Sequence, residues 1–108
     1  MTRWYLLLAA TMPLLAISAL AAGIHADVGK GHALVRAWCS GCHAVEPGDL
    51  DGPVPDIPSF TAVARQPSTT TSALHAFLAT PHGYMPDIKL KTGEIDAVIT
   101  YILSLRKP

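Results

Sequence analysis

Two cysteines and a histidine in the stretch AWCSGCHAV, residues 37–45, constrain this chain more than any other feature. Cys39 and Cys42 are separated by two residues, and His43 follows directly. With Trp38 in front, the stretch matches a redox-active dithiol of the W-C-x-x-C type. With His43 behind, it matches a covalent haem attachment site, and the two thiols alone are half of a zinc site. The rest of the sequence has to distinguish these three interpretations.

The first residues have the layout of an export signal. Arg3 is followed by a long apolar stretch without a charge before Asp27, and its alanine-rich end fits a small-residue cleavage site. We therefore expect residues 1–22 to be a signal peptide, with an uncleaved membrane anchor as the alternative, and residues 23–108 to be the domain. In both cases we expect the domain to lie outside the cytoplasm, in the periplasm.

The composition limits both the core and the partners of this chain. Its 2 cysteines lie in one C-x-x-C, so they cannot close a long loop, and a domain this small needs another source of stability. The 8 basic and 8 acidic residues give a formal net charge of +0, without the basic stripe that nucleic-acid binding requires. We therefore expect no nucleic-acid partner, and membrane contact only if the N-terminal segment is retained.

Apolar periodicity and capping residues predict an all-α domain. Helices are expected over about residues 28–39, 59–65, 70–80 and 92–107. The expected N-caps of the first three helices are Asp27, Ser59, and Thr70 or Thr71. Proline- and glycine-rich loops separate the helices, and no segment shows the alternation of a strand.

This helical setting decides among the three interpretations of the cysteines. A C-x-x-C dithiol belongs after a strand in a βαβ unit, whereas the residues before Cys39 have helical periodicity. A structural zinc ion needs a second ligand pair, and the spacing of His75 and His82 is too wide to supply one. Two thiols at this spacing can reach the two vinyl groups of one porphyrin, and His43 can then bind its iron. The sequence therefore favours covalent haem attachment.

Four features between about Asp27 and Leu105 resemble those of a small bacterial class I cytochrome c. They are the motif CSGCH, the stretch GYMPDIKL, the C-terminal segment EIDAVITYILSL, and Gly31 in the segment GHALVRAWC. One departure is Val35, which stands where an aromatic residue is common in the family. The resemblance implies a cytochrome c fold, with roughly three to five short helices around one covalently bound haem c.

The same resemblance implies a role for each residue of the site. Cys39 and Cys42 would form thioether bonds to the haem, and His43 would be the proximal iron ligand. Met85, in GYMPDIKL, would be the distal ligand, and the other two of the 3 methionines fall in the export segment. His82 lies on the same loop and is the rival distal ligand.

Further residues are expected around the haem. Pro53, in DGPVP, resembles the family's proline whose carbonyl accepts the proton of the proximal imidazole, and Pro55 is its alternative. Phe60 and Phe77 are expected in the haem pocket.

A second group of residues is expected to have structural roles or none. Gly31 and Tyr101 resemble the family's crossing point of the terminal helices, where glycine lets two backbones approach. No role is assigned to the remaining histidines His25, His32 and His75.

These features predict a periplasmic mono-haem c-type cytochrome with His/Met ligation, an electron carrier and not an enzyme. Lys89 and Lys91 follow the Met85 loop and are expected to face an acidic patch on a partner. The expected partners are donor dehydrogenases and acceptor oxidases or reductases, and the protein is expected to be a monomer. The alternatives are a haem-based sensor or small-ligand enzyme with a displaceable Met85, and a dedicated cytochrome subunit of a periplasmic dehydrogenase or oxidase.

Overall fold

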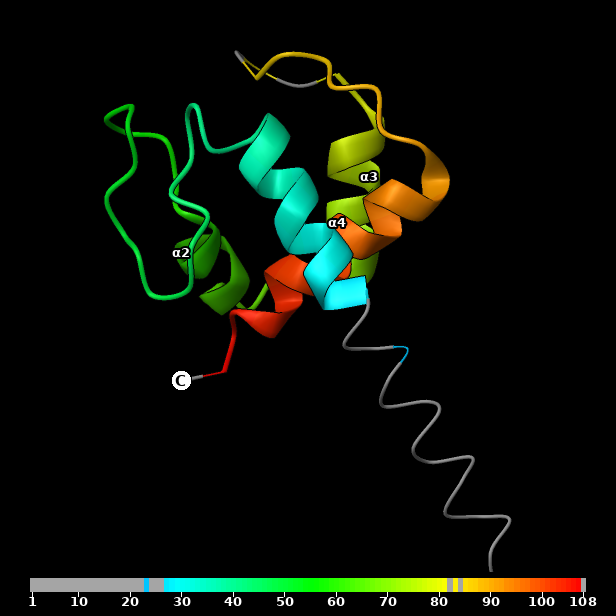
Figure 1. The fold of residues 1–108 in the computed structure, drawn as a ribbon. Coiled ribbons are helices and arrows are strands. Elements are labelled where there is room, and N and C mark those ends of the chain that lie inside the picture. The colour runs from blue at the N-terminus through cyan, green and yellow to red at the C-terminus, as the bar shows by residue number, and fades with distance from the viewer. Residues whose placement is uncertain (1–22, 24–26, 82, 84, 108) are drawn as a thin grey trace, which may run out of the picture.

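The computed structural model describes residue 23 and residues 27–81, 83 and 85–107 (Figure 1). The regular elements in these ranges are all helices: a first helix over residues 27–38, then α2 (Phe60–Arg65), α3 (Thr71–Ala79) and α4 (Thr92–Ser104). The all-α prediction is therefore confirmed. None of the helices described is long and apolar enough to cross a membrane. The predicted export segment, residues 1–22, and His82 lie outside the described residues.

The first helix leads directly into the two cysteines. Asp27 already belongs to this helix, so it is not the N-cap that the sequence suggested. The buried Val35 anchors the helix in the core. The Val35 carbonyl accepts a hydrogen bond from Cys39 N at 2.9 Å, and the Cys39 carbonyl accepts one from His43 N at 2.9 Å. The first helix therefore ends in a hydrogen-bonded turn that contains Cys39, Cys42 and His43.

Side-chain caps stabilise the starts of α2 and α3. Ser59 Oγ accepts a hydrogen bond from Ala62 N at 3.0 Å, and Thr70 Oγ1 accepts one from Ala73 N at 3.1 Å. Because helices of 6 and 9 residues make few internal hydrogen bonds, such caps contribute a large share of their local stability. Both caps were predicted from the sequence.

Helix α4 forms the centre of the core. At its start the Glu94 carboxylate accepts a hydrogen bond from Lys91 N at 2.8 Å. Its predicted apolar stripe is buried and consists of Ile95, Val98, Ile99 and Ile102. Helices α2 and α3 both pack against α4, and the first helix crosses it (Figure 1).

Gly31 lies where the first helix crosses α4. A Cβ atom at this position would lie 2.0 Å from the carbonyl oxygen of Ala97 and 2.7 Å from Cβ of Tyr101. Only glycine allows the two backbones to come this close. The predicted crossing of Gly31 and Tyr101 is confirmed.

Two loops complete the described structure and frame the site. Residues 43–58 extend away from the helices on the side of α2, and residues 85–91 arch over the ends of the first helix and α3 (Figure 1). The second loop carries Met85 back towards the cysteines.

Candidate functional site

The turn after the first helix presents two thiols in different environments. Cys39 is buried, whereas Cys42 is exposed, and both are free. Burial raises the pKa of the Cys39 thiol to about 11, because a buried thiolate loses its hydration. A reactive dithiol needs a cysteine with a lowered pKa, so this environment disfavours the dithiol interpretation.

His43 is held by a hydrogen bond on one side of its ring. Its Nδ1 lies 2.6 Å from the carbonyl oxygen of Pro58, and since a carbonyl can only accept, Nδ1–H is the donor. This bond selects the tautomer in which Nε2 keeps its lone pair for a metal ion. The Phe60 ring lies against the imidazole with the ring centroids 4.9 Å apart, so the imidazole is held from two directions.

The carbonyl that accepts this proton belongs to Pro58, and the prediction of Pro53 is wrong. Pro53 and its alternative Pro55 are both exposed. The long loop returns to the motif only at its end, where Phe60 N donates to the carbonyl of Ala44 at 2.9 Å. This backbone pairing brings Pro58 next to the imidazole, and nothing in the local sequence indicates it.

A mostly apolar cavity connects Cys39 with the loop that carries Met85. It encloses about 20 Å³ and is otherwise open to solvent. Its lining includes Cys39, Leu78, Met85, Ile88, Leu90 and Val98. The structure therefore brings the buried thiol and the predicted distal ligand, which are far apart in the sequence, to one cavity.

These donors fit a covalently bound haem. The turn supplies two thiols, His43 offers Nε2 and Met85 offers a soft thioether, and donors of these types can hold a c-type haem. The apolar lining of the cavity suits the porphyrin ring. Phe60 is buried beside His43, and its role in a haem pocket stays a prediction.

The place of Phe77 in the haem pocket stays a prediction, because Phe77 is not among the described residues that line the cavity. The Phe77 side chain is 51% exposed, whereas Leu74 is buried and Leu78 lines the cavity. Because residues four apart share one face of a helix, Leu74 and Leu78 define the inner face of α3. Phe77 lies beside that face, and hydrophobicity alone does not reveal the difference.

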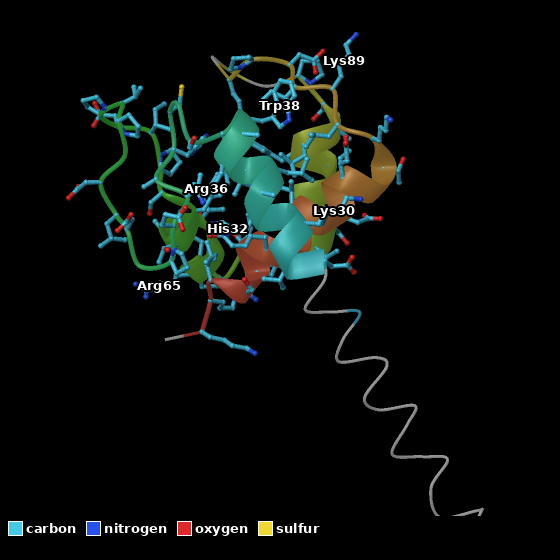
Figure 2. All side chains as sticks on the ribbon, viewed as in Figure 1. Lys30, His32, Arg36, Trp38, Arg65 and Lys89 are labelled. Carbon is cyan, nitrogen blue, oxygen red and sulfur yellow. The ribbon has the colours of Figure 1, made fainter. Side chains whose placement is uncertain are left out.

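Two exposed side chains are neighbours in the chain of residues that line the cavity. Ile88 and Leu90 line the cavity, while Lys89 between them is exposed. Trp38, which directly precedes Cys39, is 62% exposed. Figure 2 shows Trp38 and Lys89 at the same end of the molecule. This end of the molecule therefore exposes an aromatic ring and a cation.

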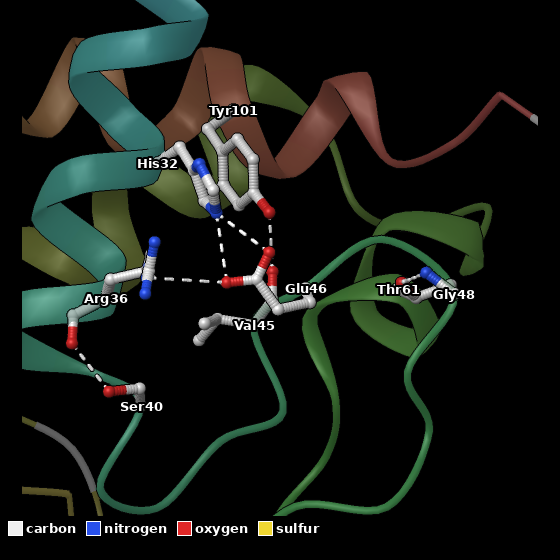
Figure 3. A network of polar contacts seen from close by, with 8 residues as sticks. All are labelled: His32, Arg36, Ser40, Val45, Glu46, Gly48, Thr61 and Tyr101. Carbon is white, nitrogen blue, oxygen red and sulfur yellow. Dashed lines mark hydrogen bonds and ion pairs between the residues drawn. The ribbon is translucent and has the colours of Figure 1, made fainter.

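A polar cluster on the other side of the motif was not predicted (Figure 3). His32 Nε2 lies 2.9 Å from Glu46 Oε2, and Arg36 Nε lies 3.6 Å from Glu46 Oε1. The His32 ring stacks on Tyr101 with a centroid separation of 5.0 Å, and the Tyr101 hydroxyl donates to the Val45 carbonyl at 2.6 Å. The partners lie on three separate segments of the chain, and no spacing rule joins them.

Two comparisons with known proteins agree with this site. The family model described as "Cytochrome C oxidase, cbb3-type, subunit III" matches residues 26–102. Cytochrome c-552 of Bradyrhizobium diazoefficiens is 38% identical over 89 residues, which make up 82% of this chain and 85% of that protein. No solved structure matches the chain.

The helical fold, the donor set and these matches define a c-type cytochrome. The chain belongs to the family described as cytochrome c oxidase, cbb3-type, subunit III. It is a mono-haem electron carrier with covalently bound haem c, and it exchanges electrons with redox partners. The resemblance in the sequence to a small bacterial c-type cytochrome is therefore confirmed.

Proposed function

We propose that Cys39 and Cys42 tether the haem through thioethers and that His43 and Met85 ligate its iron. The shared cavity carries this proposal, because Cys39 and Met85 line it together. His43 offers Nε2 since its Nδ1–H donates to the Pro58 carbonyl. Bound haem supplies an iron that alternates between the ferric and ferrous states.

The ligand pair determines which chemistry this chain supports. With a side chain in each axial position, no position remains for a substrate, so we infer that the protein carries single electrons and has no enzymatic activity. A thioether is a soft, neutral donor that favours ferrous iron, and His/Met ligation therefore raises the reduction potential. His82 as distal ligand would lower it, but the cavity contact of Met85 supports the methionine.

We also propose that residues 1–22 direct export and are then removed, so that the domain acts in the periplasm. The long uncharged stretch after Arg3 supports this proposal. Covalent haem attachment of this kind takes place outside the cytoplasm, which agrees with export. An uncleaved anchor is the alternative, and the mass of the purified protein distinguishes the two.

Redox partners are proposed to dock at the open side of the cavity. Lys89 and Lys91 are exposed there on the loop, and positive charges steer an acidic partner into contact. The exposed Trp38 is suited to anchor such a contact, because tryptophan is enriched at the energetic centres of interfaces. We propose a monomer that binds its electron donor and acceptor in turn, such as a dehydrogenase and an oxidase or reductase.

A dedicated subunit of a periplasmic dehydrogenase or oxidase is the second candidate function. The description of the matched family names subunit III of a cbb3-type oxidase, which favours this candidate over a haem-based sensor or small-ligand enzyme. The chemistry would be the same, but one partner would cover the docking surface permanently. Co-purification of the haem-loaded protein with oxidase activity from solubilised membranes would distinguish a subunit from a diffusing carrier.

The variant Met85→Ala tests the ligation directly. We expect the wild-type ferrous protein to be low-spin and not to bind carbon monoxide at neutral pH. Met85→Ala should become high-spin and bind carbon monoxide, because one axial position is then open. Its reduction potential should fall by on the order of 0.1 V, a fraction of the ~0.8 V range that axial ligands span.

Leu78→Ala is the matched control, because Leu78 lines the same cavity without a donor atom. This variant should remain low-spin and should not bind carbon monoxide. If Met85→Ala instead remained low-spin and still excluded carbon monoxide, another side chain would be the distal ligand. Carbon monoxide binding by the wild-type protein would favour the sensor or small-ligand enzyme.

A further inference from the structure

Glu46, three residues after His43, contacts two side chains of the first helix. His32 Nε2–H donates to its carboxylate, with distances of 2.9 and 3.1 Å to the two oxygens, because an ionised carboxylate can only accept hydrogen bonds. Arg36 Nε lies 3.6 Å from Glu46 Oε1. His32 and Arg36 are four residues apart, so they share one face of the helix and reach the same carboxylate (Figure 3). One side chain of the loop thus connects it to the first helix.

This contact encloses the complete haem-binding motif. Arg36 lies three residues before Cys39, and Glu46 lies three residues after His43. The ion pair therefore joins the two ends of the segment 36–46, which contains both thiols and the imidazole. Inside the segment, His43 N donates to the Cys39 carbonyl at 2.9 Å. The motif is thus a short loop of chain that a polar contact closes.

The backbone between His43 and Glu46 is also held from two other helices. The hydrogen bonds from these helices run from Phe60 N to the Ala44 carbonyl at 2.9 Å and from the Tyr101 hydroxyl to the Val45 carbonyl at 2.6 Å. The donors of these two bonds belong to α2 and α4. Of these three contacts, only that of Glu46 leads to the first helix, which carries the cysteines. Glu46 therefore connects the backbone after His43 to the helix before Cys39.

The strength of this contact depends on its exposure and on the order of its partners. The His32 and Glu46 side chains are 34% and 44% exposed, and an ion pair at an exposed site contributes little by itself. The His32 ring is already ordered, however, because it stacks on Tyr101 with the ring centroids 5.0 Å apart. Less side-chain entropy is therefore lost when it binds the carboxylate. We expect the contact to restrict the segment after His43 without being required for folding.

We propose that Glu46 is a positioning residue for the proximal ligand, and that it sets the orientation of the His43 imidazole relative to a haem attached at Cys39 and Cys42. This inference rests on the proposed ligation of the iron by His43. Glu46 acts through the backbone of residues 44 and 45.

The plane of the imidazole depends on two separate restraints. The hydrogen bond from His43 Nδ1–H to the Pro58 carbonyl, at 2.6 Å, holds one atom of the ring. The contact of Glu46 with the first helix holds the backbone from which the ring projects. Loss of the second restraint leaves the ring free to tilt about its bond to Pro58, so the imidazole meets the haem at a different angle.

Proton NMR of the haem-loaded full-length protein in the ferric state tests this role. In a low-spin ferric haem, the spread of the haem methyl resonances depends on the orientation of the axial imidazole plane and not on the stability of the fold. Glu46→Ala should change this spread, because the segment after His43 loses its contact with the first helix. An unchanged spread in a low-spin Glu46→Ala protein would overturn the inference.

Two further variants separate the contact from the charge of Glu46. In Glu46→Gln the amide oxygen still accepts from His32 Nε2–H, so the spread should stay close to that of the wild-type protein. Asp51 is an exposed residue of the same loop, and Asp51→Ala removes the same charge while it keeps the contact. A change in Asp51→Ala as large as that in Glu46→Ala, or the lack of rescue by Glu46→Gln, would indicate an effect of charge and contradict the positioning role.

Hydrogen exchange in the ferrous protein provides a second measurement. The Nδ1–H proton of His43 should exchange with solvent roughly 3- to 10-fold faster in Glu46→Ala, since its bond to Pro58 opens more often. Faster exchange together with an unchanged ferric spectrum would show a contribution to stability alone, and the positioning role would be wrong. Visible spectra of the same samples report on the ligation. A wild-type ferric protein that is not low-spin would overturn the proposed ligation itself, and this inference with it.

Discussion

Tyr101 links α4 to the segment that follows His43 through a single hydroxyl group. Its side chain is 3% exposed, and the hydroxyl donates to the Val45 carbonyl at 2.6 Å. Burial, and secondarily the charge of Glu46, raises the pKa of Tyr101 from 10.0 to about 12. The folded protein therefore keeps the Tyr101 proton under conditions in which the unfolded chain loses it.

We expect the raised pKa of Tyr101 to make the free energy of unfolding depend on pH in the alkaline range. The contribution of Tyr101 is fully present below pH 10.0 and is lost as the pH rises towards about 12. Tyr101→Phe should lack this component and should lower the free energy of unfolding at neutral pH by about 1–2 kcal/mol, because the buried Val45 carbonyl loses its donor. Urea unfolding of both proteins at several pH values measures the difference. Parallel pH profiles would contradict the assignment.

At the residue scale, local spacing predicts the haem-binding residues but not the distant residues that form hydrogen bonds with them. Cys39, Cys42 and His43 were predicted from their spacing, the helical periodicity before them and the lack of a second zinc-ligand pair. The carbonyl of Pro58 could not be chosen over that of Pro53, because the choice depends on the backbone pairing of Phe60 with Ala44 at the end of a long loop.

The helix crossing at Gly31 determines how the first helix packs on α4. In Gly31→Ala the added methyl group would meet the Ala97 carbonyl, so one helix must shift. We expect the free energy of unfolding to fall by about 1–3 kcal/mol, the usual cost of overpacking a core contact. Thermal and denaturant unfolding of the haem-loaded protein measure this loss.

Gly29 offers a control within the same helix. A Cβ atom at Gly29 meets nothing within 4 Å. Gly29→Ala should therefore leave stability unchanged or raise it by up to about 1 kcal/mol, since alanine has the higher helix propensity. Equal losses in the two variants would show that the crossing does not require glycine at position 31.

At the element scale, helix positions were largely predictable because caps and apolar periods are local signals. Ser59 and Thr70 cap α2 and α3 as predicted, and α4 begins at Thr92. The exposure of Phe77 could not be read from its hydrophobicity, because Leu74 and not Phe77 is buried on α3. The His32–Glu46 pair was missed as well, since its members are 14 residues apart on different elements.

At the scale of the whole molecule, Lys89 and Lys91 belong to the surface proposed to bind redox partners. We expect the double variant Lys89→Gln/Lys91→Gln to react more slowly with an acidic redox partner at low salt, by roughly 10-fold, because electrostatic steering accelerates association. The salt dependence of the rate should also weaken. Stopped-flow kinetics at several ionic strengths measure both effects.

Two basic residues far from the cavity provide the control for this surface. Arg65 and Lys107 line a separate groove with Val28 and Leu105. The double variant Arg65→Gln/Lys107→Gln has the same change in net charge, and it should keep the wild-type rate and salt slope. Equal slowing of both double variants would indicate net charge alone, and an unchanged rate in the Lys89/Lys91 variant would exclude docking at this loop.

The covalent attachment of haem at Cys39 and Cys42 is the central claim, and the pyridine haemochrome spectrum tests it most directly. The wild-type protein should retain its haem on a denaturing gel and show the spectrum of a haem with two thioether bonds. Cys39→Ser and Cys42→Ser should each shift that spectrum towards a haem with one free vinyl group, and the double variant should lose the stained band. Haem that separates from the denatured wild-type chain, or that stays bound to the double variant, would contradict the assignment.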